Sequence, residues 1–362
     1  MKAVAVNPST RQVGLVDIEE PVLQRSTQVR VRILEVGVCG TDKEICRFDY
    51  GTPPSGSEYL VLGHEALGIV EDAGADVTRV KQGDLVAVMV RRPCHHDTCG
   101  PCQAGRQDFC FTGDYTERGI NHYHGFMTSH IVEEQEYVCP IPSELRDIAV
   151  LTEPLTIAEK GLQQVKDVQD RLPWTSAKKH TAVVLGAGPV GLLGAMALRI
   201  RGFETFVYSR EPHDDARAQL AASMGATYVS SAEKNADQLA AQIGNIDLVY
   251  EATGVSSVSF EVLRVLGVNG ICIFTGIPGL HGPTPTDIDG LMRSLVLKNQ
   301  LVLGTVNANR PAFENAIADL AQFRRQFPEA IGGLISKRWQ IAEHSDLLLG
   351  RAGGIKNVIS LE

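Results

Sequence analysis

The sequence lacks the features that mark several classes of protein. It has no block of lysine and arginine residues, and its formal net charge is −9, from 34 basic and 43 acidic residues. Nucleic acid and anionic membrane surfaces, which attract basic patches, are therefore not expected as partners. No uninterrupted apolar run reaches the length of a membrane span, and there are no internal repeats or low-complexity tracts.

The first residues also lack the pattern of a secretion signal. MKAVAVNPSTRQVGLVDIEEP alternates like a strand, without the charged and apolar regions of a signal peptide. Aromatic residues make up only 6%, whereas there are 35 glycines, which favours an α/β protein. We expect a cytoplasmic protein. In that reducing compartment, clustered cysteines are more often metal ligands than disulfides.

With 362 residues, the chain is too long for one core, and two patterns divide it. The N-terminal part has short β-branched runs such as YLVLGHEALGIVEDAG between glycine, proline and aspartate turns, which predicts a partly open β-barrel. The later part alternates apolar strands with helices, which predicts a doubly wound parallel sheet. We therefore predict an α/β protein with one domain formed by residues 1–155 and 309–362 and a second formed by 156–308.

A glycine-rich loop stands between a predicted strand and a predicted helix. LGAGPVG contains Gly186, Gly188 and Gly191. In a dinucleotide-binding fold, the first glycine permits a tight turn and the second lets the backbone approach a pyrophosphate. The third allows close helix packing, and the helix N-terminus supplies N–H donors. We also expect cofactor contacts from Pro189, Val190, Thr253, Gly276 and Asn307.

The end of the next strand bears on which dinucleotide binds. The sequence there is VYSRE, so Ser209 and Arg210 stand where NAD-binding proteins usually have an acidic residue. An arginine can bind the 2′-phosphate of NADP through charge-assisted hydrogen bonds, which favours NADP. Glu211 is one residue further and could bind the ribose of NAD instead.

Three separate segments carry metal-ligating side chains. Thiolate, imidazole and carboxylate together suit zinc, and three protein ligands leave a fourth position for water or substrate. The segments are VGVCGTD with Cys39, Thr41 and Asp42, LGHEALG with His64 and Glu65, and LTEPLTIAEK with Glu153.

These motifs resemble a known family. Cys-Gly-Thr-Asp, Gly-His-Glu, a four-cysteine lobe and GAGPVG, in this order, are similar to the zinc-containing medium-chain alcohol dehydrogenases. LTEPLTIAEK, GRQDFC and GTVNANR resemble the glucose dehydrogenase branch of that family. The resemblance covers nearly the whole chain. It implies a GroES-like β-barrel catalytic domain and a Rossmann domain.

The resemblance also implies roles for single residues. A catalytic zinc would be held by Cys39, His64 and Glu153, although some relatives have glutamine at the last position. Glu65 would approach the metal in alternation with water, Thr41 would relay the substrate proton, and Asp42 would support the site. Zinc would stabilise the developing alkoxide as a Lewis acid while hydride passes to the nicotinamide.

The implied substrate is a sugar. The resemblance points to Thr41, Glu117, Glu153 and Asn307 as substrate contacts, since carboxylates accept hydrogen bonds from hydroxyls. Ile157 stands where some relatives have an aspartate that contacts the sugar. We expect oxidation of D-glucose, or a related aldose, at C1 to the lactone. The alternatives are a polyol or threonine-type dehydrogenase, or a non-catalytic cofactor-binding relative. A homodimer or homotetramer is implied as well.

Four of the eight cysteines fall in RRPCHHDTCGPCQAGRQDFC. Their spacing is C-x4-C-x2-C-x7-C, two residues longer after the first cysteine than is usual in the family. Four thiolates form a closed shell around a structural zinc, without a position for substrate. His95 or His96 could replace Cys94 as a ligand. The predicted structural ligands are Cys94, Cys99, Cys102 and Cys110.

Overall fold

The computed structural model describes residues 1–172, 179–279, 282–283 and 285–362, and these form two compact units. The first unit comprises Met1–Thr156, Asn307–Leu320 and Ile335–Glu362. The second comprises Ile157–Val306 and Ala321–Leu334. Ala321–Leu334 thus groups with the second unit, although it lies within the span 309–362 that we assign from the sequence to the first domain.

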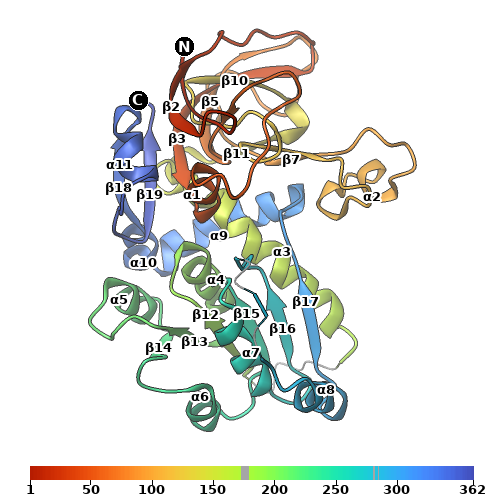
Figure 1. The fold of residues 1–362 in the computed structure, drawn as a ribbon, viewed down its shortest axis with the longest axis vertical. Coiled ribbons are helices and arrows are strands. Elements are labelled where there is room, and N and C mark those ends of the chain that lie inside the picture. The colour runs from red at the N-terminus through yellow and green to blue at the C-terminus, as the bar shows by residue number, and fades with distance from the viewer. Residues whose placement is uncertain (173–178, 280–281, 284) are drawn as a thin grey trace. The chain divides into compact units, whose positions relative to one another are not determined.

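Strands form the framework of the first unit (Figure 1). They are β1 (Lys2–Asn7), β2 (Gln12–Asp17), β3 (Gln28–Val38), β4 (Leu60–Val61), β5 (Glu65–Ala73), β6 (Leu85–Val88), β7 (Arg91–Arg92), β8 (Thr116–Arg118), β9 (His122–Tyr123), β10 (His130–Glu134), β11 (Val138–Ile141), β18 (Ile335–Gln340) and β19 (Lys356–Ser360). The largest sheet has the order β11-β6-β5-β3-β19-β18, and β10 also pairs with β3. Two smaller sheets have the orders β2-β1-β4 and β7-β8-β9.

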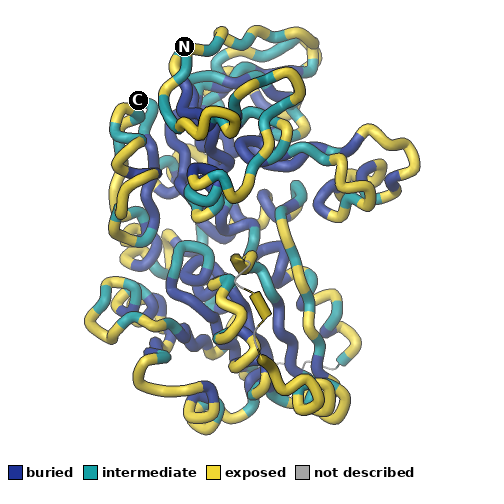
Figure 2. Tube along the Cα trace, viewed as in Figure 1, coloured by how far each residue is buried: buried dark blue, intermediate teal, exposed yellow. Residues whose placement is uncertain are grey.

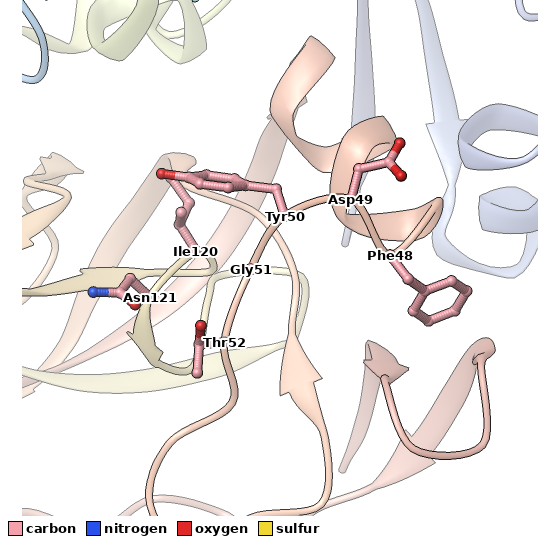
Figure 3. A pocket seen from close by; sticks show the side chains of 7 residues that line it. All are labelled: Phe48, Asp49, Tyr50, Gly51, Thr52, Ile120 and Asn121. Carbon is pink, nitrogen blue, oxygen red and sulfur yellow. The ribbon is translucent and has the colours of Figure 1, made fainter. Parts of the chain in front are cut away.

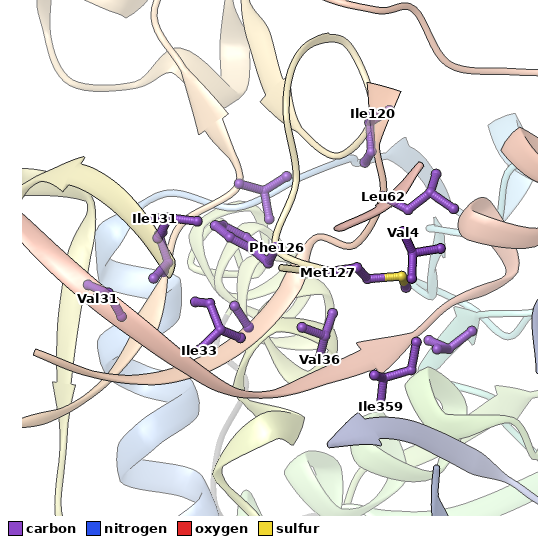
Figure 4. Close-up of a cluster of buried hydrophobic side chains, with 14 of the residues drawn as sticks. Val4, Val31, Ile33, Val36, Leu62, Ile120, Phe126, Met127, Ile131 and Ile359 are labelled. Atoms are coloured by element: carbon purple, nitrogen blue, oxygen red, sulfur yellow. The ribbon is translucent and has the colours of Figure 1, made fainter. Parts of the chain in front are cut away.

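The long strand β3 organises this unit. It pairs antiparallel with β5, β10 and β19, so the last strand of the chain lies beside β3. Its inward side chains join a buried cluster that includes Val31, Ile33, Phe126 and Ile359 (Figure 4). Three helices accompany the strands: α1 (Gly40–Cys46), α2 (Gly100–Gln103) and α11 (His344–Leu348).

The run YLVLGHEALGIVEDAG forms two strands in different sheets rather than one. β4 ends at Val61 and β5 begins at Glu65. Gly63 lies between them with a φ of 89°, a conformation that glycine adopts readily. A Cβ at this position would also lie 2.8 Å from Met127 Cγ. The break places His64 at the start of β5.

The second unit contains a parallel sheet. Its strands are β12 (Thr181–Leu185), β13 (Glu204–Ser209), β14 (Thr227–Ser230), β15 (Leu248–Glu251), β16 (Ile271–Phe274) and β17 (Leu301–Gly304). Their order, β14-β13-β12-β15-β16-β17, reverses direction between β12 and β15. In open parallel sheets, ligands bind beyond the carboxyl ends of the strands at such a reversal.

Helices follow these strands along the chain. They are α4 (Pro189–Ile200), α5 (Ala216–Ser223), α6 (Ala236–Ile243), α7 (Ser256–Arg264) and α8 (Ile288–Leu297). Helix α10 (Pro328–Gly333) also belongs to this unit. Two further helices, α3 (Thr152–Gln169) and α9 (Arg310–Gln326), each have residues in both units.

Burial explains the apolar composition of the parallel strands. All five residues of β12, TAVVL, are buried, as are all four of β15, LVYE (Figure 2). Strands covered on both faces read as continuous apolar runs, which the sequence shows here. Among the described helices, none has the length and hydropathy that crossing a membrane requires.

Candidate functional site

Three of the predicted metal ligands converge in the first unit. The Sγ of Cys39, a ring nitrogen of His64 and a carboxylate oxygen of Glu65 all lie within 4.8 Å of one another. Cys39 directly follows β3 and caps α1, whereas His64 and Glu65 open β5. Gly37 pairs with Glu65 between these strands, so the sheet register brings the end of β3 to the start of β5.

Asp42 connects the two sides of this cluster from a fully buried position. Its carboxylate accepts hydrogen bonds from the backbone N–H of Cys39, at 2.9 Å, and of Gly63, at 3.3 Å. Its Oδ1 also lies 3.5 Å from Nδ1 of His64. Burial by itself raises the pKa of Asp42, but the interaction with His64 and the hydrogen bonds outweigh burial and lower it. Asp42 is therefore a carboxylate that supports both segments.

Thr41 and Glu153 lie near the cluster, and Glu153 is not among the donors that lie within 4.8 Å of one another. The Sγ of Cys39 is 3.9 Å from Oγ1 of Thr41. Glu153 stands in the first turn of α3 and is partly buried. Burial, together with the carboxylates of Glu65 and Asp42, raises the pKa of Glu153 to about 7, although His64 and Lys356 act in the opposite direction.

The chemistry of this cluster fits a bound cation. A thiol, an imidazole and a carboxylate within 4.8 Å are the donor set that zinc prefers. Nδ1 of His64 is buried without a hydrogen-bond partner among the described residues. Crowding Asp42, Glu65 and Glu153 around one buried imidazole is unfavourable unless positive charge balances them, and the buried Lys356 ammonium supplies part of that charge. The residues present can therefore hold a divalent metal.

In the second unit, the three glycines of the loop have three different surroundings. Gly186 has a φ of 97°, and a Cβ there would lie 2.7 Å from Thr253 Cγ2. A Cβ on Gly191, in the first turn of α4, would lie 2.1 Å from the Gly186 carbonyl oxygen. A Cβ on Gly188, the N-cap of α4, would meet nothing within 4 Å. The loop therefore leaves open space at the helix N-terminus, where a phosphate fits.

Pro189 and Val190 form the first helical residues after this loop. Proline is suited to that position because its missing N–H would be unpaired in any case. Ser209, at the end of β13, donates a hydrogen bond through Oγ to Glu211 Oε2 at 2.5 Å and accepts one from the Ala187 N–H at 3.2 Å. The Arg210 side chain is 91% exposed, and its Nε lies 3.6 Å from Glu211 Oε1. An exposed guanidinium therefore stands beside the end of β13.

A buried glutamate that the sequence did not single out organises the neighbouring loops. Glu251 ends β15 and is 1% exposed. Its Oε1 accepts from the N–H of Thr253 at 2.7 Å, from its Oγ1 at 2.6 Å and from the N–H of Gly254 at 2.8 Å. Its Oε2 accepts from the Gly276 N–H at 3.1 Å. One carboxylate thus holds both Thr253 and Gly276, two predicted cofactor contacts.

Glu117 and Asn307 meet in the first unit, together with Arg91. Glu117 and Arg91 are 5% and 4% exposed. Oε1 of Glu117 accepts hydrogen bonds from Nε of Arg91 at 3.0 Å and from Nδ2 of Asn307 at 2.9 Å. Nη2 of Arg91 lies 2.9 Å from the same oxygen. This arrangement fixes Glu117 as an oriented carboxylate.

A pocket of about 310 Å³ adjoins the turn that contains Glu117. The backbone N–H groups of Ile120 and Asn121 donate to the Glu117 carbonyl oxygen. Burial and the Glu117 carboxylate both raise the pKa of Tyr50. Figure 3 shows the lining residues, which are Phe48, Asp49, Tyr50, Gly51, Thr52, Ile120 and Asn121. The pocket therefore offers two aromatic rings, hydroxyl groups, a carboxylate and an amide.

The four cysteines of the lobe form a second tight cluster. Their sulfur atoms lie within 4.8 Å of one another, with α2 and the flanking loops between β7 and β8 (Figure 1). Cys99 accepts a hydrogen bond from the Phe111 N–H at 3.4 Å, and this bond is the main reason that its pKa is lowered. Nε2 of His96 lies 2.5 Å from Oδ2 of Asp114, so His96 has a carboxylate partner outside the cluster.

The sequence did not identify three residues of these sites, namely Arg91, Glu251 and Lys356. Lys356 is buried and forms an ion pair with Glu65. No motif marks these residues, because strand pairing or loop packing creates their contacts. Arg91 and Glu117 did offer a signal, since residues of opposite charge stand on either side of the cysteine lobe.

Comparison with known families supports both parts of the fold. Residues 25–143 match the alcohol dehydrogenase GroES-like domain. Residues 146–361 match the glucose dehydrogenase C-terminus, which is more than half of the chain.

Relatives resemble the chain over its whole length. It is 37% identical to glucose 1-dehydrogenase of Methanocella arvoryzae, over 100% of this chain and 99% of the relative. It is also 37% identical to glucose 1-dehydrogenase of Thermoproteus tenax, over 100% of both chains. The structure of Haloferax mediterranei glucose dehydrogenase in complex with NADP, Zn and gluconolactone is similar, with a TM-score of 0.90 and 29% identity. That match covers 100% of this chain and 99% of the other.

Proposed function

This chain belongs to the glucose dehydrogenase branch of the zinc-containing medium-chain alcohol dehydrogenases, and we propose that it oxidises an aldose at C1 with NADP. The best candidate substrate is D-glucose, which gives the lactone. The observation that carries this proposal is the convergence of Cys39, His64 and Glu65 within 4.8 Å, in a chain that also folds a dinucleotide-binding sheet.

Cys39, His64 and Glu153 are the residues that we assign as holders of a catalytic zinc, with Glu65 as a fourth, alternating ligand. Glu153 lies outside the tight set, but its carboxylate interacts electrostatically with both His64 and Glu65, and this supports its assignment as a ligand. Zinc, when bound, supplies a Lewis acid that favours the ionised form of a substrate hydroxyl.

The surrounding side chains position groups and move a proton. Asp42 holds the backbone of Cys39 and Gly63, and through its contact with His64 it orients the imidazole. The Thr41 hydroxyl, 3.9 Å from the Cys39 sulfur, is placed to receive the proton of the substrate hydroxyl and pass it on.

Sugar recognition is assigned to Glu117, Asn307 and Glu153. The three donors described above all reach Oε1 of Glu117, so we assign Oε2 to a sugar hydroxyl. The adjoining pocket contributes Tyr50, Thr52 and Asn121, which supply a ring face and polar groups suited to a hydroxylated ring. A substrate without the matching hydroxyl would leave Oε2 of Glu117 without that donor, so this site favours aldoses over simple alcohols.

The cofactor assigned to the second unit is NADP, with NAD as a second acceptor. Gly186, Gly188 and Gly191 would hold the pyrophosphate at the N-terminus of α4. Ser209 and Arg210 would contact the 2′-phosphate, since Arg210 is exposed and next to the strand end. NADP, when bound there, would supply a nicotinamide ring as the hydride acceptor.

The lobe is assigned a structural zinc held by Cys94, Cys99, Cys102 and Cys110. Its four sulfurs already form a complete donor set, and His96 is engaged with Asp114. Reduced, clustered thiols also favour the cytoplasm as the location of the protein.

We further infer a homodimer or homotetramer. Helix α8 exposes Ile288, Met292, Val296 and Leu297, each more than 60% accessible. Exposed apolar side chains gathered on one element are typical of a protein interface. β17 is an edge strand of the parallel sheet and could extend it to a second copy.

A panel of substrates tests the proposal. Glucose, galactose, xylose, sorbitol and threonine would each be compared by kcat/KM with NADP and with NAD, alongside a zinc count per chain. We expect aldoses to react best and glucose to give its lactone. Inert aldoses together with turnover of sorbitol would indicate a polyol dehydrogenase. Stoichiometric cofactor binding without any turnover would indicate a non-catalytic relative.

A further inference from the structure

A lysine from the last strand of the chain lies at the candidate metal cluster. Lys356 begins β19 and is 2% exposed, and its ammonium forms an ion pair with Oε2 of Glu65, which is equally buried. Its Nζ also donates a hydrogen bond to the Val38 carbonyl oxygen at 3.1 Å. β19 pairs with β3 (Figure 1). In this pairing Asn357 is opposite Val38, the residue before Cys39. The sheet register thus delivers the ammonium to this cluster.

Gly37 provides the space in which the pair meets. A Cβ at this position would lie 2.0 Å from Oε2 of Glu65 and 2.9 Å from Cε of Lys356. The Glu65 carboxylate therefore turns across the backbone of β3 towards Lys356. A carboxylate oxygen of the same residue remains within 4.8 Å of the Cys39 and His64 donors. Glu65 is accordingly placed between two cationic positions, the ammonium and the candidate metal site.

Charge explains why a buried lysine is stable here. Its ammonium pairs with the Glu65 carboxylate and donates to the Val38 carbonyl oxygen, so its charge is compensated inside the protein. An isolated buried ammonium would be costly, whereas one surrounded by anionic groups is compensated. Removing the ammonium would leave Glu65 as a buried carboxylate whose remaining cation is the metal.

We propose that Lys356 is a positioning residue that holds the Glu65 carboxylate away from the metal and so keeps a coordination position free for the substrate. This inference rests on the proposed function, since it requires a metal at the Cys39–His64 cluster. In this proposal, the ion pair determines whether Glu65 or the substrate is the fourth ligand of the metal. Without Lys356, Glu65 would occupy that position permanently.

Cobalt substitution tests this inference without relying on activity. The variants are Lys356→Met, Lys356→Arg and the double variant Lys356→Met/Glu65→Gln, each loaded with cobalt and, separately, with zinc. The lobe contribution is removed by subtracting the spectrum of a Cys39→Ser protein. The visible cobalt bands report which ligands the metal has, and transfer of zinc to a chromophoric chelator gives the release rate.

We expect Lys356→Met to shift the visible cobalt bands, because Glu65 replaces water as the fourth ligand, and to slow zinc release about 10-fold or more. Lys356→Arg should retain the wild-type spectrum, and the double variant should regain it. A Lys356→Met protein with unchanged bands, or with faster zinc release, would overturn the inference, as would a double variant that stays altered. Lys356→Gln, with the same expected outcomes, replaces Lys356→Met if that protein does not fold.

The metal count separates this inference from the proposed function. Wild-type protein that binds one cobalt per chain, retained in the Cys39→Ser protein, would overturn the proposed function and the inference with it. Two cobalt ions per chain with no spectral change in Lys356→Met would overturn the inference alone.

Discussion

Arg91 and Glu117 face each other on the two short strands that bound the cysteine lobe, and their side chains are joined by a 3.0 Å hydrogen bond. Both residues are buried, and Asn307 adds a third member at 2.9 Å from the same carboxylate oxygen. The lobe therefore begins and ends next to a candidate sugar contact. This adjacency links the part of the chain richest in cysteine to substrate recognition.

Replacing Glu117 with glutamine should lower kcat/KM for glucose about 10- to 100-fold, because a hydrogen bond to a charged group is lost. The free energy of unfolding should fall as well, by about 3 kcal/mol, since Arg91 is left buried without its counter-ion. Steady-state kinetics and denaturant unfolding measure the two effects. Glu58→Gln, at an exposed glutamate of the same unit, is the control and should change neither. Unchanged glucose kinetics in Glu117→Gln would contradict the assignment.

Arg210→Ala tests the choice of cofactor. Because the exposed guanidinium is assigned to the 2′-phosphate, KM for NADP should rise about 10- to 100-fold. KM for NAD, which has no such phosphate, should change far less and serves as the internal control. Equal weakening of both cofactors would show that Arg210 does not contact the phosphate.

Cys39→Ser should remove most of the turnover and one zinc per chain while NADP binding is retained. The reason is that Cys39 belongs to the candidate metal cluster in the first unit, whereas the glycine loop belongs to the second. Cys46→Ala is the matched control, since Cys46 is buried and outside both cysteine-containing clusters. Elemental analysis and cofactor titration would be measured together. If Cys39→Ser kept wild-type turnover, this cysteine would be a core residue rather than a ligand.

Cys102→Ser should lower stability more than turnover, which is the reverse of the result expected for Cys39→Ser. It removes one thiolate from a closed set of four, so the lobe should lose its zinc and the midpoint of thermal unfolding should fall. Its kcat should remain much closer to the wild-type value than that of Cys39→Ser. A loss of turnover as complete as in Cys39→Ser would mean that the lobe takes part directly in the reaction.

Glu251→Gln tests the loops beyond the parallel sheet. An amide nitrogen in place of one carboxylate oxygen would face N–H donors, so the segments at Thr253 and Gly276 should lose their fixed positions. We expect the dissociation constant of NADPH, measured by fluorescence titration, to rise about 10-fold. Glu261→Gln, at an exposed glutamate on α7, is the control. If both variants bind NADPH with the same affinity, Glu251 does not contribute to cofactor binding.

How much of this site the sequence predicts depends on whether the contacts are local. The glycine loop and the four-cysteine cluster could be predicted because their members are close in the chain and their spacing carries the geometry. Cys39 and His64 could be paired only through a family resemblance, since the register of β3 and β5 brings them together. Lys356 lies 318 residues from Val38, to which it donates, and no local pattern marks it. Such contacts depend on sheet pairing, which single-sequence periodicity does not encode.

The fold shows the same contrast. The alternation of strands and helices predicts the parallel sheet, because apolar strands covered on both faces, such as β12 and β15, are typical of one. The break between β4 and β5 was not apparent in YLVLGHEALGIVEDAG, since both halves are apolar. The left-handed backbone of Gly63 creates that break, and it places His64 and Glu65 at the cluster.

The central claim is that this protein transfers hydride from C1 of an aldose to NADP, and isotope transfer tests it most directly. The zinc-loaded protein would be incubated with glucose carrying deuterium at C1 and with NADP, and the NADPH formed would be analysed by mass spectrometry. We predict one deuterium in each NADPH, in proportion to the lactone produced. Unlabelled NADPH, or no reduction of NADP by glucose, would contradict the claim.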